Sequence, residues 1–144
     1  MATQERSAHV TWSGNLASGS GTVHVGTGAL ADFPVSWPSR SGDPAGKTSP
    51  EELLAAAEAA CYSMKLSGEL GKAGTPPNRL DVDATVTLDL DQGAISSVAI
   101  RVSADAPGLE VTKLQELAEL AKTDCPVSKA LSAVGDFRLE ASLA

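Results

Sequence analysis

The stretch Ser49-Pro-Glu-Glu-Leu-Leu-Ala-Ala-Ala-Glu-Ala-Ala-Cys-Tyr-Ser-Met64 decides the fold, because it predicts one long helix with a cysteine in its interior. Ser49 suits the N-cap and Pro50 the first helical position, and the two carboxylates that follow are favoured by the positive end of the helix dipole. Small and apolar residues then share one stripe at helical spacing, namely Leu54, Ala57, Cys61, Met64 and Gly68. We expect this helix to run to Gly71 and to be deeply buried, with Cys61 in its middle.

The sequence before this helix predicts a small sheet. Between residues 9 and 37, short apolar patches alternate with Gly and Ser, which is typical of a meander of about three short strands. Residues 38–49 are rich in turn formers and predict a loop, in which Arg40 is the one obvious functional group.

The sequence after the helix predicts a second sheet with helices. Residues 80–90 and 94–104 alternate between apolar and polar side chains around a Gln92-Gly93 turn, which indicates an antiparallel hairpin with one wet face. Residues 109–122 have the pattern of an amphipathic helix, a short helix follows Pro126, and residues 136–143 alternate like a closing strand. We therefore expect a single α+β domain over residues 1–144, with an N-terminal β-meander, a long central helix and a second antiparallel sheet with helices.

The composition limits the partners and the compartment. A net charge of -7 argues against nucleic acid as a partner, since phosphate binding needs clustered Lys and Arg. Aromatic residues make up only 3% of the chain, which favours a core extended by dimerisation. The start of the chain lacks a signal-peptide pattern, and no run of about 18 apolar residues predicts a membrane span. Because two cysteines are too few for a secreted disulfide framework, we expect a cytoplasmic protein.

Each of the two cysteines has a context that redox chemistry could use. In Thr123-Asp-Cys-Pro-Val-Ser128, Pro126 suits the first position of a helix and places Cys125 near its N-cap, where unpaired N–H groups stabilise a thiolate. Two cysteines that meet in the fold could run a redox cycle, in which one attacks and the other resolves. His9 and His24 have no metal-ligand spacing with the cysteines, so we expect no metal site.

Ordinary structural roles remain open for all of these residues. A buried free cysteine is a common small hydrophobe, and Cys125 could simply begin a helix. Arg40 in a polar loop is by default solvated, and Glu51 by default stabilises the helix dipole. Glu58 lies one turn before Cys61, where it could be exposed at a rim or could raise the pKa of the thiol.

Taken together, the helix stretch and Cys125-Pro-Val-Ser128, which follows 64 positions after Cys61, closely resemble the OsmC/Ohr family of thiol-dependent hydroperoxide reductases. The likeness runs the length of the chain, and Trp12-Ser-Gly-Asn-Leu16 is more similar to the OsmC branch than to the Ohr branch. The resemblance implies an OsmC-like fold and an intertwined homodimer with two active sites at the subunit interface. The family often has His where this chain has Glu58, and Phe where it has Tyr62.

The resemblance also implies the roles of four residues. Cys61 corresponds to the peroxidatic cysteine, Cys125 to the resolving cysteine, Arg40 to the catalytic arginine and Glu51 to its paired glutamate. These roles are chemically sensible, because a thiol in the middle of a helix has no helix N-terminus of its own and needs a cation to hold its thiolate. Arg40 could supply this cation while Glu51 orients the guanidinium.

The implied activity is the reduction of organic hydroperoxides, and less well of hydrogen peroxide, through a Cys61 sulfenic acid and a Cys61–Cys125 disulfide. The enzyme would hold no cofactor, since an external dithiol or a lipoylated protein would regenerate it. Two alternatives remain: a redox-sensing or ligand-binding protein without efficient turnover, and a structural dimer in which both thiols merely pack.

Overall fold

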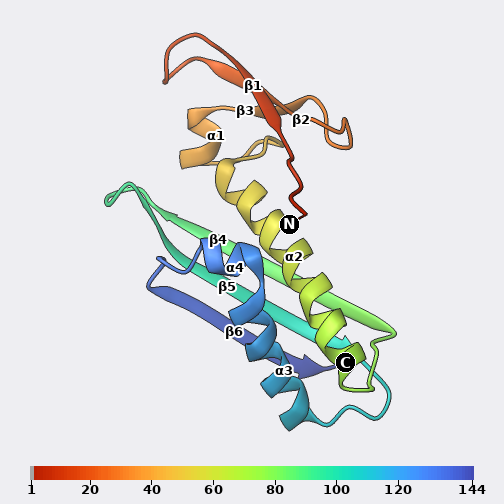
Figure 1. Cartoon of the computed structure of the whole chain (residues 1–144). Coiled ribbons are helices and arrows are strands. Elements are labelled where there is room, and N and C mark those ends of the chain that lie inside the picture. Colours follow the sequence, from red (N-terminus) through yellow and green to blue (C-terminus); the bar gives the residue numbers. More distant parts are fainter. Residues whose placement is uncertain (1) are drawn as a thin grey trace. The chain divides into compact units, whose positions relative to one another are not determined.

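The computed structural model describes residues 2–144 and contains two compact units, one that ends at Pro50 and one over Glu51–Ala144. The first unit holds the expected meander, with β1 (Ala8–Ser13), β2 (Ser20–Val25) and β3 (Phe33–Val35) paired antiparallel in the order β1-β2-β3. In Figure 1 these strands carry the red and orange colours of the N-terminal part of the chain. The prediction of three short strands is confirmed.

A five-residue helix, α1 (Trp37–Ser41), occupies part of the segment that the sequence predicted as a loop. The Oγ atom of Ser36 accepts a hydrogen bond from the backbone N–H of Ser39 at 3.3 Å, and Pro38 lies in the first turn, where its missing N–H costs nothing. Ser and Pro suit a helix start as well as a turn, so the turn-former count could not separate the two. The loop prediction is therefore wrong over residues 38–41.

The second unit contains the predicted order of elements. These are α2 (Pro50–Lys72), β4 (Arg79–Asp89), β5 (Ala94–Asp105), α3 (Val111–Asp124), α4 (Pro126–Ala130) and β6 (Asp136–Leu143). The sheet order is β4-β5-β6, and the hairpin of β4 and β5 is antiparallel as expected. However, β6 pairs parallel with β5, so the sheet is mixed rather than antiparallel. The connection through α3 and α4 returns the chain to the end of the sheet where β5 began, and alternation within a strand carries no information on its direction.

The core of the second unit lies between this sheet and its helices, with α2 and α3 side by side over one face (Figure 1). Tyr62 and Leu66 of α2 are fully buried, as are Val102 of β5 and Leu114 of α3. The hydroxyl of Tyr62 donates a hydrogen bond to the carbonyl of Ala118 at 2.9 Å, which satisfies its polar end and ties α2 to α3. Small and aliphatic side chains fill the rest of this core.

The buried stripe of α2 is not the one that the sequence predicted. Met64 was placed on the buried face but is 71% exposed, whereas Leu66 is fully buried. The residues of α2 that are buried are Glu51, Glu58, Tyr62, Leu66, Glu69 and Leu70. Three of them are acidic, so a stripe chosen for apolar residues fell on the wrong side. Charged residues occupy a buried face when they have polar partners there.

Candidate active site

The two cysteines are in contact. Cys61 lies on α2, and Cys125 is the single residue between α3 and α4. The thiol of Cys125 donates a hydrogen bond to the sulfur of Cys61 across 3.1 Å, and both are free cysteines. Cys125 is fully buried and Cys61 is half-buried. Two thiols at this distance need little movement to join as a disulfide.

The backbone holds Cys125 at the junction of two helices. Its N–H donates to the carbonyl of Ala121 at 2.8 Å and closes α3, while its own carbonyl accepts from the N–H of Lys129 at 2.9 Å and opens α4. Pro126 is the first residue of α4, so Cys125 occupies the N-cap position that the sequence predicted. Both sides of the cysteine are therefore fixed by helical hydrogen bonds.

The start of α4 also contacts Cys61. Burial, the largest effect, raises the pKa of the Cys61 thiol, and a hydrogen bond with the backbone of Val127 lowers this pKa. The N–H groups in the first turn of a helix have no partner within the helix, so the N–H of Val127 is available to a sulfur. Cys61 thus lies in the interior of its own helix, as expected, but it contacts the first turn of a different helix. Side-chain patterns could not reveal a backbone donor.

A buried polar pair lies one helical turn from the cysteines. The hydroxyl of Ser128 donates a hydrogen bond to Oε1 of Glu58, whose side chain is fully buried. Oε2 of Glu58 has no hydrogen-bond partner among the described residues. Burial raises the pKa of Glu58, which favours a neutral carboxyl, and the bond from Ser128 acts against this. The negative charge of an ionised Glu58 would raise the pKa of Cys61, so of the two alternatives the structure supports burial beside the thiol and not exposure at a rim.

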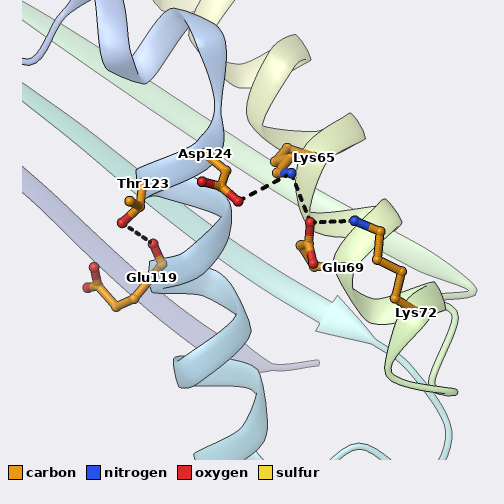
Figure 2. Close-up of polar contacts among 6 residues, drawn as sticks. All are labelled: Lys65, Glu69, Lys72, Glu119, Thr123 and Asp124. Atoms are coloured by element: carbon orange, nitrogen blue, oxygen red, sulfur yellow. Dashed lines mark hydrogen bonds and ion pairs between the residues drawn. The ribbon is translucent and has the colours of Figure 1, made fainter.

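An ion-pair network joins three residues of α2 to the last residue of α3 (Figure 2). The Nζ atom of Lys65 is 2.9 Å from Oε1 of Glu69 and 3.6 Å from Oδ2 of Asp124, the residue just before Cys125. Lys72 contacts the same Glu69 oxygen at 3.0 Å, and both hydrogen-bonded lysines lower the pKa of this carboxyl. The network explains why an acidic side chain is tolerated on the buried stripe of α2.

Arg40 and Glu51, the other two predicted site residues, belong to different units. Arg40 lies in α1, with its guanidinium carbon 5.9 Å from the centre of the Trp37 ring, which is within the range of a cation–π contact. It also lines a cavity of about 140 Å³ within the first unit, together with apolar side chains such as Trp12 and Leu16. Glu51 lies in the first turn of α2 and is buried. Their pairing, and the action of Arg40 on Cys61, stay predictions.

The described part of the chain contains neither a candidate membrane span nor a candidate metal cluster. Within residues 2–144, no helix has both the length and the hydropathy that a bilayer crossing requires. Nor do these residues contain a group of three or more His, Cys, Asp or Glu side chains that could hold a metal ion. We assign the chemistry to the cysteine pair because its two sulfurs are in contact.

Two thiols in contact, one on a helix in the core and one at a helix junction, define the class of proteins with a redox-capable cysteine pair. A family model described as OsmC-like protein matches residues 42–140, and the chain belongs to this family. The peroxiredoxin OsmC of Escherichia coli (strain K12) is 40% identical over 124 residues, which are 85% of this chain and 86% of that protein.

Solved structures agree with this assignment. A protein from Legionella pneumophila, named as an organic hydroperoxide resistance protein OsmC, matches with a TM-score of 0.72 at 22% identity, over 100% of this chain and 99% of that chain, and so supports the fold. The organic hydroperoxide resistance protein OhrB of Bacillus subtilis matches with a TM-score of 0.63 at 26% identity, over 96% of this chain and 98% of that chain. The predicted family and the α+β fold class are confirmed.

Proposed function

We propose that this chain reduces organic hydroperoxides to alcohols, and does so more efficiently than it reduces hydrogen peroxide. The observation that carries the proposal is the contact of 3.1 Å between the sulfurs of Cys61 and Cys125. By its family and its 40% identity to a peroxiredoxin, the chain is an enzyme of the peroxidase class. The substrate preference and the roles of individual residues are the further content of the proposal.

In the first step, the thiolate of Cys61 attacks the O–O bond of the hydroperoxide. The sulfur takes one oxygen and becomes a sulfenic acid, and the other oxygen leaves as an alkoxide that gains a proton to give the alcohol. The hydrogen bond with the backbone of Val127 favours the thiolate. In this proposal Arg40 supplies a positive charge to the thiolate and the peroxide, and Glu51 orients the guanidinium.

In the second step, Cys125 resolves the sulfenic acid. Its sulfur attacks the sulfur of Cys61, the S–O bond breaks, and the departing hydroxide takes the thiol proton to form water. An external dithiol, for which a lipoylated protein is our candidate, then reduces the disulfide by thiol exchange, and no bound cofactor takes part.

Two features of the chain support the organic substrate and the dimer. Cys61 and Val127 pack against the apolar core of the second unit, where an alkyl group is favoured over water. Large apolar side chains are exposed on the first unit and on α2, including Leu16 (61%) and Met64 (71%). In the intertwined homodimer that we propose, with sites at the subunit interface, a partner would cover these side chains.

The test is peroxide consumption in excess dithiothreitol, with tert-butyl hydroperoxide, cumene hydroperoxide and hydrogen peroxide as substrates. We expect the wild type to turn over, Cys61→Ser to be inactive, and Cys125→Ser to keep a single oxidation event or a slowed turnover. A wild type that is oxidised once per chain and then stops would make the chain a redox sensor. A specificity constant that is no higher for cumene hydroperoxide than for hydrogen peroxide would refute the substrate preference.

A further inference from the structure

Three contacts join α2 to the segment 124–128 in matching order. Glu58 bonds Ser128, Cys61 contacts Cys125, and Lys65 pairs with Asp124. The three α2 residues lie at the i, i+3 and i+7 spacing that places side chains on one face of a helix. A polar contact therefore lies on each side of the contact between the cysteines.

We propose that Glu58 and Ser128 are positioning residues, whose buried hydrogen bond holds the Cys125 segment against Cys61 in the arrangement from which the disulfide forms. The use of this arrangement in turnover rests on the proposed peroxidase function. The bond itself exists in the reduced chain and can be tested without a peroxide.

The two polar contacts beside the cysteine pair differ in strength. Ser128 is 4% exposed and Glu58 is fully buried. If their hydrogen bond is lost, water cannot reach these polar atoms to replace it. The side chains of the Lys65–Asp124 pair are partly exposed, at 27% and 42%, and ion pairs that water reaches contribute little. Positioning therefore depends mainly on the Glu58–Ser128 bond.

The short helix α4 needs an anchor of this kind. It has five residues, and helices of this length are not stable on their own. A bond from its third residue, Ser128, to the long helix α2 fixes the first turn of α4 and, with it, Cys125 and the N–H of Val127. The entropy of bringing the two thiols together is then lost on folding and not during the reaction.

A glutathione equilibrium measures this positioning directly. The Cys61 thiolate attacks oxidised glutathione and releases one reduced glutathione, and Cys125 then attacks the mixed disulfide and releases the second. The equilibrium constant gives the effective concentration of one thiol at the other. We expect Ser128→Ala to lower this value about tenfold, as the loss of a buried hydrogen bond would.

Matched variants separate positioning from general damage. Ser128→Thr keeps the hydroxyl and should restore the wild-type value, and Glu58→Gln keeps the acceptor oxygen and should stay close to it. Ser63→Ala removes a hydroxyl from α2 two residues from Cys61, but this hydroxyl bonds within the helix, to the carbonyl of Ala59 at 2.6 Å. Ser63→Ala should therefore leave the value unchanged, and urea unfolding checks that each variant is folded.

A wild-type effective concentration in folded Ser128→Ala would overturn the proposal, as would an equal loss in Ser128→Thr and Ser128→Ala. If Ser128→Ala fails to fold, Glu58→Gln provides the test, because it keeps the acceptor oxygen. A tenfold loss of effective concentration in Glu58→Gln would overturn the proposal, and a value near that of the wild type would support it. Because no peroxide enters the measurement, an inactive wild type whose equilibrium depends on Ser128 would reject the peroxidase and keep the positioning role. An active wild type whose equilibrium does not change in Ser128→Ala would keep the peroxidase and reject the positioning role.

Discussion

Replacing Val127 with proline removes the backbone N–H that bonds Cys61. Val127 is the second residue of α4, where an N–H has no partner within the helix and where proline is tolerated. The exchange therefore removes the donor to the sulfur without breaking a helical hydrogen bond. We expect the pKa of Cys61 to rise further above its ordinary value, since burial would then act with less opposition.

The size of the effect follows from the strength of the bond. A hydrogen bond to a charged group contributes about 1.5–3 kcal/mol, and about 1.4 kcal/mol corresponds to a factor of ten in a population. Because Cys61 is half-buried and water can replace part of the lost bond, we expect the lower end of this range. The thiolate population at neutral pH should fall about tenfold.

The assay is the rate of alkylation of Cys61 by iodoacetamide as a function of pH, in a Cys125→Ser background so that a single thiol reacts. The Val127→Pro profile should shift to higher pH and reach the same plateau once the thiol is ionised. Val127→Ala keeps the N–H and serves as the matched control. An unshifted profile in Val127→Pro, or an equal shift in Val127→Ala, would refute the role of the N–H.

Three further outcomes are expected. Glu58→Gln should lower the pKa of Cys61, because the charge of Glu58 raises it, and thiolate absorbance during a pH titration measures this. Leu66→Ala should cost about 2–5 kcal/mol of unfolding free energy in urea, because its side chain is fully buried. Tyr62→Phe should cost about 0.5–1.5 kcal/mol, because it removes the buried hydrogen bond from the hydroxyl to the carbonyl of Ala118, and an unchanged unfolding curve would contradict this prediction.

Periodicity predicted the elements of this fold better than their orientation. The alternation of residues 80–90 predicted β4 because one of its faces is wet and the other packs on the helices. The same kind of pattern in β6 gave no direction, and its pairing with β5 proved parallel. For α2, the pattern predicted the helix but not its buried side, because Glu58 and Glu69 find polar partners that come from elsewhere in the fold or from the next turn.

The candidate site, too, was only partly predictable from the sequence. Residue types and spacing singled out both cysteines, and the Pro that follows Cys125 predicted the helix start that fixes it. The N–H of Val127 could not be predicted, since every residue except proline carries the same donor and only the packing of α4 on α2 decides which one contacts a sulfur.

The contact of Ser128 with Glu58 agrees with the spacing of the two residues from the cysteines. Residues three apart lie on the same face of a helix, and Glu58 precedes Cys61 by three positions just as Ser128 follows Cys125 by three. If Cys61 and Cys125 meet between antiparallel segments, these two polar residues must also face each other. The family resemblance implied that the cysteines meet, but the direction of the two segments and the burial of Glu58 came only from the structure. A His in place of Glu58 would present a different donor and acceptor set to this serine, which makes residue 128 the position to examine wherever residue 58 is exchanged.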